Sequence, residues 1–103
     1  MKITSKQILA MNLKYYRKLL NLSQEKFAEG IGSNLVYLNQ MENCKRKPTI
    51  DMLDKIANGI TKMIQDNKKD LKGKMDDYIV TSALLITYND SHKTNFNRID
   101  EKK

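Results

Sequence analysis

The chain has few of the residues that stabilise small secreted domains. Its 103 residues include one cysteine, one proline and no tryptophan. A single cysteine cannot form an internal disulfide, so the composition indicates a reducing compartment. The opening residues MKITSKQILAMN contain no uninterrupted apolar run, and no later run reaches the length of a membrane span. We therefore expect a cytoplasmic protein with no membrane partner.

Residue patterns typical of catalytic and ligand sites are also missing. The sequence has no glycine-rich phosphate loop, no nucleophile beside a base and no cluster with metal-ligand spacing. His92 stands in a polar stretch without a second ligand at metal spacing, which predicts a solvated loop residue. Cys44 is interpreted as an ordinary thiol. We expect no enzyme activity, no cofactor and no small-molecule ligand.

Positive charge is abundant and unevenly distributed. Nineteen Lys and Arg against twelve Asp and Glu give a net charge of +7. Residues 1–60 hold ten basic and five acidic side chains, whereas 61–103 hold nine and seven. A polyanion is the natural partner of such a chain, and the N-terminal part dominates its electrostatic field.

Four helical patterns occupy the N-terminal part. Leu9, Leu13 and Tyr16 recur at the spacing of a helix with one buried stripe. Asn21 and Gly32 suit the left-handed backbone of turns, and Ser, Asn and Thr stand at helix-capping positions. The predicted helices span 5–20, 23–30, 34–43 and a fourth that begins after Thr49 and whose pattern permits helix as far as Gly73.

The C-terminal part is ambiguous. The apolar block 78–88 fits a helix, but its β-branched residues and the turn-like NDSHKTN that follows also fit a hairpin. Asp76 and Asp77 suit a helix start and favour the helix. We divide the chain into a domain at 1–60 and an extension at 61–103 that serves dimerisation. Charged residues at Leu84 and Leu85 should then give monomers that still fold.

Residues 24–43 have the spacing of two helices crossing at a steep angle. Ala28 allows close approach, and Gly32 lies in the turn that follows. Leu38 and Met41 then direct the next helix back towards the first. With these features, residues 13–57 resemble the lambda-repressor and Cro-like helix-turn-helix regulators, the XRE family. The matching stretch reads LKYYRKLLNLSQEKFAEGIGSNLVYLNQMENCKRKPTIDMLDKIA.

The resemblance implies an all-α fold. It predicts a compact four- to five-helix lambda-repressor-like DNA-binding domain, here with an additional C-terminal element. It further implies a bidentate pair between Arg17 and Glu42. Members of the family often have glycine at the position of Cys44.

The predicted helix 34–43 has an inner and an outer face. At about 100° per residue, Met41 and Glu42 lie within about 60° of Leu38, whereas Val36 and Gln40 lie about 160° away. The resemblance implies that the outer face enters the major groove of double-stranded DNA. Gln40 suits adenine and Val36 suits a thymine methyl group, which implies an A·T-rich site. The candidate base-contacting residues are Leu35, Val36, Asn39 and Gln40. The candidate contacts to the DNA backbone are Gln24, Tyr37, Asn43, Lys45, Arg46 and Lys47.

These features predict a sequence-specific transcriptional regulator, a repressor that acts as a homodimer. One helix reads only a few base pairs, and two copies related by a twofold axis increase discrimination. Two alternatives remain open. One is a protein-binding module on the same fold, an antitoxin or inhibitor that docks through Leu35, Val36 and Tyr37. The other is a restriction-modification controller, which shares the DNA-binding mechanism.

Overall fold

The computed structural model describes residues 3–67, 79–89 and 92. The described part is helical and contains no strand, which confirms the predicted all-α class. Its elements are α1 (Ser5–Leu19), α2 (Gln24–Gly30), α3 (Leu35–Glu42), α4 (Ile50–Asp66) and α5 (Ser82–Leu85). Helix α4 ends at Asp66, with Asn67 as its C-cap. Residues 68–73, to which the sequence permits the helix to extend, and the predicted helix start at Asp76 and Asp77 lie outside the described residues.

Local sequence signals explain where the first four helices begin. The side chains of Ser23, Asn34 and Thr49 each accept a hydrogen bond from the backbone N–H three residues later. Such caps satisfy donors that the first helical turn cannot satisfy internally. At α1 the cap is reciprocal, because Thr4 accepts from the backbone of Gln7 and the Gln7 side chain accepts from the backbone of Thr4.

The turns use backbone conformations that favour particular residues. Asn21 follows α1 with φ 56°, and Gly32 follows α2 with φ 72°. Both lie in the left-handed region, which glycine adopts freely and asparagine tolerates. The predicted turns at these two positions are confirmed.

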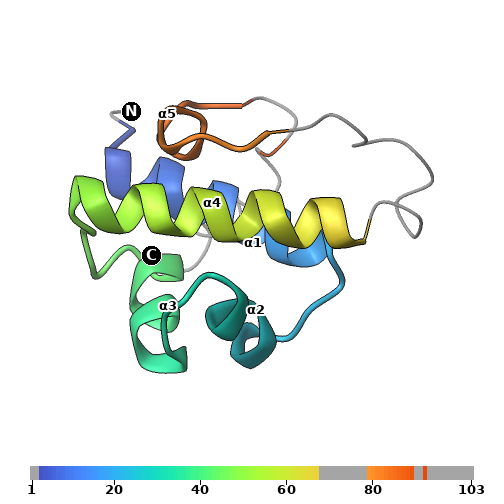
Figure 1. The fold of residues 1–103 in the computed structure, drawn as a ribbon. Coiled ribbons are helices and arrows are strands. Elements are labelled where there is room, and N and C mark those ends of the chain that lie inside the picture. The colour runs from blue at the N-terminus through green and yellow to red at the C-terminus, as the bar shows by residue number, and fades with distance from the viewer. Residues whose placement is uncertain (1–2, 68–78, 90–91, 93–103) are drawn as a thin grey trace.

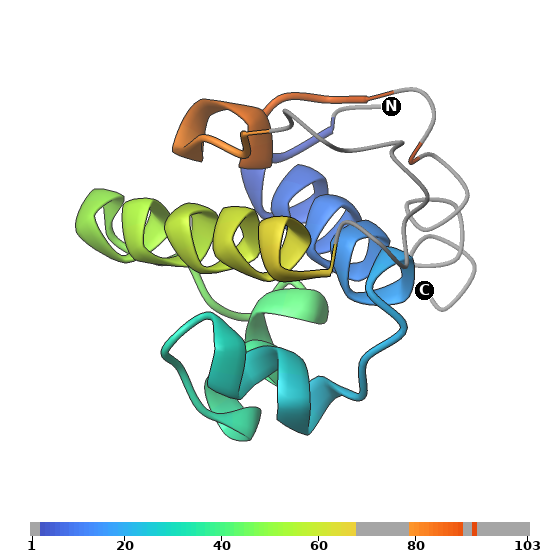
Figure 2. The same cartoon turned by 45° about the vertical axis from the view of Figure 1, so that its right-hand side comes forward.

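The core lies where α1, α2, α3 and α4 converge. Figure 1 shows α2 and α3 together on one side of α4, with α5 on the opposite side, and the rotated view in Figure 2 agrees. Each helix contributes the apolar stripe that its sequence period predicts. The buried apolar side chains that these helices contribute to the core cluster are Leu9, Leu13, Tyr16, Phe27, Ala28, Leu38, Met41, Leu53, Ile56, Ala57, Ile60 and Ile64.

Close approach of α4 to the end of α2 depends on a glycine. A Cβ atom at Gly59 would lie 2.7 Å from the carbonyl oxygen of Gly30 and 2.8 Å from Cα of Ile31. Backbone atoms cannot yield as a flexible side chain can, so a larger residue would separate the two helices. Helix α4 continues past this point to Asp66 and therefore crosses residue 60, the predicted domain boundary. The functional division at that boundary stays a prediction.

The described part of the C-terminal block is neither a long helix nor a hairpin. Its only helix is the single turn α5, capped by Thr81. Val80 and Leu85 are buried in the common core, at 2% and 0% exposure. The expectation that charged residues at both Leu84 and Leu85 leave a folded monomer is therefore wrong for Leu85, because a charge there would enter the core.

Two polar side chains attach this segment to the helices beneath it. The Asn12 amide nitrogen donates to the carbonyl oxygens of Leu84, Leu85 and Thr87 at 3.1, 2.8 and 3.1 Å. On α4, the Thr61 hydroxyl accepts from the Val80 amide at 2.8 Å and lies 3.0 Å from the Val80 carbonyl oxygen. The segment 79–89 is thus held by hydrogen bonds to its backbone as well as by apolar burial.

His92 is buried, which corrects the prediction of a solvated loop residue. It is 4% exposed, its Nδ1 lies 2.7 Å from Oδ1 of Asn12, and its ring stacks on Tyr15 with centroids 3.6 Å apart. Since an amide oxygen only accepts, Nδ1 carries the proton in this pair. Burial lowers the pKa of His92 from its usual value. The prediction failed because the partners on α1 are about eighty residues away in sequence.

None of the described helices has the length and apolar character needed to cross a bilayer. Within the described ranges, no group of three or more His, Cys, Asp or Glu side chains is placed to hold a metal ion.

Candidate nucleic-acid interface

Helix α3 has one buried face and one exposed face, as predicted from its sequence. Leu38 and Met41 are fully buried and Glu42 is 1% exposed. On the opposite side Val36 is 67% exposed and Leu35 43% exposed. The division follows from the helical repeat, which places residues three and four apart on the same side.

Helix α3 and helix α5 lie on opposite sides of the domain. Helix α5 contacts α1 and α4, on the far side of α4 from α3 (Figure 1). Asn39 and Asn43 are exposed, and Gln40 is half-buried. All four predicted base-contacting residues, Leu35, Val36, Asn39 and Gln40, therefore retain exposed surface.

A buried carboxylate fixes α3 to the two preceding helices. Glu42 accepts from Nε and Nη2 of Arg17 at 2.9 and 3.0 Å, which confirms the bidentate pair implied by the resemblance. Oε1 of Glu42 also accepts from the amide of Gln24 at 3.0 Å. A buried charge requires such partners, because an unpaired carboxylate in this position would be strongly destabilising.

A row of amide side chains leads from Gln24 to the end of α3. Asn43 donates to the backbone carbonyl of Asn39 at 2.7 Å and to its Oδ1 at 3.2 Å. Asn39 in turn donates to Oε1 of Gln24 over a longer 3.5 Å. Gln24 and Asn43, which are predicted to contact the DNA backbone, are thus joined through Asn39, which is predicted to contact a base.

A polar hollow lies beside this row. Its lining comes from α1, α2 and the end of α3 and consists of Lys14, Arg17, Lys18, Gln24, Asn39, Glu42 and Asn43. Cationic and amide donors around one depression suit an anionic oxygen ligand such as a phosphate. Lys14 and Lys18 were not among the predicted site residues. Their four-residue separation on the helix that carries Arg17 is the sequence signal that could have indicated them.

The chain reverses tightly after α3. Cys44 has φ 62°, and the Lys45 amide donates to the Gln40 carbonyl at 2.8 Å. This is the helix-ending geometry in which glycine is favoured, because a Cβ is disfavoured in the left-handed region. The conformation explains why glycine is common at this position among the proteins that the sequence resembles.

The reversal places Arg46 over the middle of α3. Its Nε donates to Oε1 of Gln40 at 2.9 Å, and its guanidinium carbon lies 4.6 Å from the centre of the Tyr37 ring. The Tyr37 ring is partly buried against the core. Lys45 and Lys47 are both exposed. Lys47 lies at the edge of an apolar groove near the start of α1. The three basic residues of the loop therefore occupy different surroundings.

These features define the class of the protein. Two short helices cross through Ala28 and the Gly32 turn, and the second presents a polar and apolar face beside cationic side chains. This is the architecture of a DNA-binding helix-turn-helix domain of the lambda-repressor and Cro-like type.

The comparisons with known proteins agree with that class. Residues 13–60, a little under half of the chain, match the family model described as Helix-turn-helix. The chain is also similar to Control protein C.SmaI of Serratia marcescens, with 38% identity over 55 residues. The match spans 53% of this chain and 66% of the relative. No solved structure matches the chain significantly.

Proposed function

We propose that the protein is a sequence-specific transcriptional regulator that binds operator DNA as a homodimer and represses transcription. The observation that carries this proposal is the position of the α3 outer face. It lies open between the polar hollow and the basic loop, and α5 packs on the other side of the domain. A helix presented in this way fits the major groove while its flanks contact phosphates.

The proposed roles follow from the chemistry of each position. Leu35 and Val36 offer apolar contacts to thymine methyl groups, and Asn39 offers an amide to base edges. Gln24, Asn43 and Lys45 contact the DNA backbone. The hollow adds Lys14 and Lys18 to this second group, and a backbone phosphate is the ligand that its donors suit.

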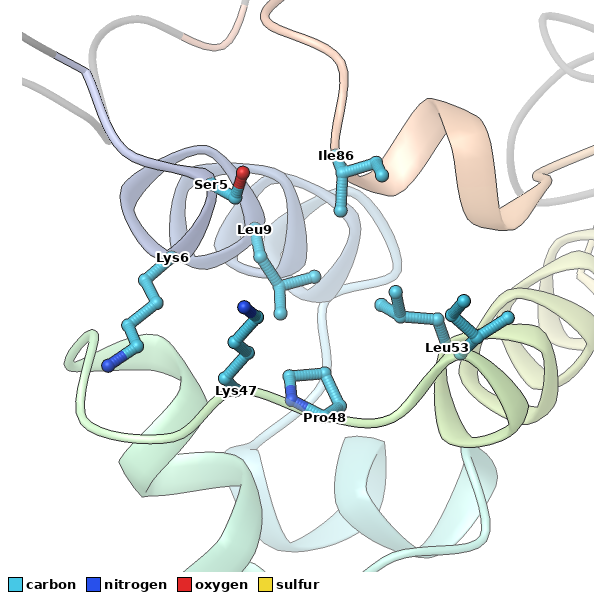
Figure 3. A pocket seen from close by; sticks show the side chains of 8 residues that line it. Ser5, Lys6, Leu9, Lys47, Pro48, Leu53 and Ile86 are labelled. Carbon is cyan, nitrogen blue, oxygen red and sulfur yellow. The ribbon is translucent and has the colours of Figure 1, made fainter.

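A homodimer requires a surface away from α3. An apolar groove near the start of α1 and α4 is lined by side chains that include Leu9, Pro48, Ile50, Leu53 and Ile86. Figure 3 shows Leu9, Leu53 and Ile86 reaching it from separate elements. Ile50 is 76% exposed and Ile86 43% exposed. Burying exposed apolar side chains of this kind against a second copy is favourable by about 25 cal/mol per Å² of apolar area.

Among narrower roles, the comparison favours a controller. The relative is called a control protein, and it is similar to this chain over 55 residues. A restriction-modification controller binds DNA by the same mechanism, so the proposals above apply to it unchanged.

Selection of bound DNA from a random pool tests the function. We expect enrichment of a palindromic sequence with half-sites about 34 Å apart, one for each subunit. If purified protein enriches no sequence and shifts no DNA at low salt, the rival protein-binding role becomes the better account of exposed Leu35 and Val36.

The salt dependence of binding tests the phosphate contacts. Six to eight neutralised phosphates per dimer give a log-log slope of about −6. Removing Lys14 and Lys18 together should make the slope less steep by about 4, because each lysine occurs twice in the dimer and each lost phosphate contact changes the slope by about 1. Lys62→Ala, an exposed change on α4, removes the same type of charge as a control. A double variant with the wild-type slope would exclude the hollow as a phosphate site.

Sedimentation tests the groove as the dimer interface. Ile50→Glu combined with Ile86→Glu should yield folded monomers, because both side chains are exposed in the single chain. Ile79→Glu provides the control, since Ile79 is 63% exposed and is not among the residues lining the groove. A groove variant that stays dimeric while retaining its circular dichroism spectrum would rule out this interface.

A further inference from the structure

The side chain of Gln40 is already engaged on the face that would meet DNA. Its Oε1 accepts the hydrogen of Arg46 Nε at 2.9 Å. Paired recognition of adenine needs both ends of a glutamine amide, because the oxygen must accept from the adenine amino group while the nitrogen donates to N7. One of the two lone pairs of this oxygen is used by Arg46, and the oxygen is turned towards the guanidinium, so Gln40 presents mainly the hydrogens of its amide nitrogen elsewhere.

The geometry also determines what Arg46 can present. Its Nε is used by Gln40, and its guanidinium plane is held over the Tyr37 ring at 4.6 Å from Cζ to the ring centre. Both Nη groups remain as a fork of donors, and the ring contact limits rotation of the plane. Arginine loses considerable side-chain freedom on binding, so a guanidinium ordered beforehand loses less.

The position of Arg46 differs from that of a side chain extended towards a flanking phosphate. The reversal at Cys44 and the Lys45 amide bond to the Gln40 carbonyl return the loop onto α3. Arg46 is exposed, as Lys45 is, but its side chain contacts Tyr37 and Gln40, and Gln40 is one of the proposed base-reading positions. The resulting edge carries hydrogen-bond donors from both Gln40 and Arg46.

An edge dominated by hydrogen-bond donors matches guanine among the four bases. Guanine presents two adjacent acceptors, O6 and N7, in the major groove, whereas adenine presents a donor beside its acceptor. A guanidinium fork binds the guanine pair of acceptors in a bidentate manner.

We propose, building on the DNA-binding function proposed above, that Arg46 reads a guanine in each half-site and that Gln40 and Tyr37 are its positioning residues. Arg46 was expected from the sequence to contact the DNA backbone, and this proposal assigns it to a base instead. Gln40 acts through Arg46 instead of reading adenine. Each half-site then contains one G·C pair whose recognition depends on three side chains from α3 and the following loop.

The test uses the operator obtained by selection and a panel of its single base-pair variants. Wild-type protein should prefer G·C at one position of each half-site by tenfold or more over the other base pairs. Arg46→Lys keeps the charge but loses the planar fork, so this preference should fall to about twofold. Binding to random-sequence DNA and the salt slope should stay within about twofold of wild type.

Variants of the two positioning residues locate the effect. Gln40→Met removes the acceptor while keeping length, and it should relax the same G·C position as Arg46→Lys. Tyr37→Leu removes the stacking ring and should also relax that position, whereas Tyr37→Phe should not. Lys45→Ala is the matched control, because it removes a neighbouring charge that is not part of this cluster, and it should weaken all sequences alike.

The possible results separate the alternatives. An Arg46→Lys variant that keeps every base preference returns Arg46 to a phosphate-contacting role and overturns the proposal. A Gln40→Met variant that relaxes an A·T pair elsewhere in the half-site makes Gln40 an independent adenine reader and overturns its positioning role. Failure of wild-type protein to enrich any sequence removes the proposed function itself, which is a different result from a specific operator without the G·C preference. Arg46→Lys lies on the surface and tests the proposal even if Gln40→Met does not fold.

Discussion

The helix-turn-helix body and the C-terminal segment are stabilised in different ways. In the body, helices α1 to α4 bury apolar stripes that repeat within each helix, and local caps define their starts. The segment 79–89 contains one short helical turn, and long-range hydrogen bonds with Asn12 and Thr61 hold its backbone. A strong local sequence pattern therefore accompanies the first region, whereas the second acquires its conformation from the surface on which it packs.

The largest expected difference lies between two adjacent leucines of the C-terminal segment. Leu85→Ala should lower the free energy of unfolding by about 3 kcal/mol, because its fully buried side chain would leave a cavity. Leu84→Ala, at 38% exposure, should cost less than about 1 kcal/mol. Urea unfolding at one fixed protein concentration measures both values, since dimer formation would add to the apparent stability. Equal small losses would mean that the segment does not belong to the core.

The next effect concerns the polar attachment between α1 and the segment. Asn12→Ala removes the donor shared by three carbonyl oxygens and the acceptor of His92, and it should cost about 2 kcal/mol. Hydrogen exchange should accelerate at backbone amides of 80–88 while those of α2 and α3 keep their protection. Asn58→Ala, an exposed change on α4, is the control. Faster exchange throughout α2 and α3 would show that the two regions open together.

A smaller effect follows from the buried histidine. Burial lowers the pKa of His92 in the folded state, so the unfolded chain takes up this proton more readily. His92 therefore contributes stability above the ordinary histidine pKa of about 6.5, and this contribution is lost as the pH falls towards the folded value. Urea unfolding between about pH 7 and 5 should record this loss as a lower midpoint in wild-type protein. His92→Phe should flatten that part of the profile, and an unchanged slope would assign it to other groups.

The smallest effect lies at the end of α3. Cys44→Gly should relieve the left-handed backbone but add freedom to the unfolded chain, for a net gain of about 0.5 kcal/mol. Cys44→Ala should give no gain, because it keeps a Cβ at φ 62°. Asn21→Gly should change less than Cys44→Gly, since asparagine tolerates this conformation better. Urea midpoints of the three variants provide the comparison.

Much of the body was predictable because its signals are close together in sequence. The caps at Ser23, Asn34 and Thr49 and the Gly32 turn were read from short windows and are confirmed. The inward position of Leu38 and Met41 followed from the helical repeat alone. Such features depend on interactions within a few residues, which the sequence displays directly.

The site was predictable in outline and less so in its connections. The exposed positions on α3 agree with the predicted faces. The contact between Gln40 and Arg46, and the arrangement of Lys14 and Lys18 around the polar hollow, depend on how the loop and α1 meet α3. His92 was misread for the same reason, because its partners lie on a helix at the opposite end of the sequence.

The amino-acid sequence by itself determined helices α1 to α4, their caps, the resemblance to helix-turn-helix regulators and the surface that α3 presents, because these properties depend on residue type and short-range periodicity. Tertiary structure alone decided how segment 79–89 is held, that Leu85 and His92 are buried, and that Arg46 lies over Tyr37 beside Gln40. Those features arise from contacts between distant segments, and their free energies exist only once the helices have packed.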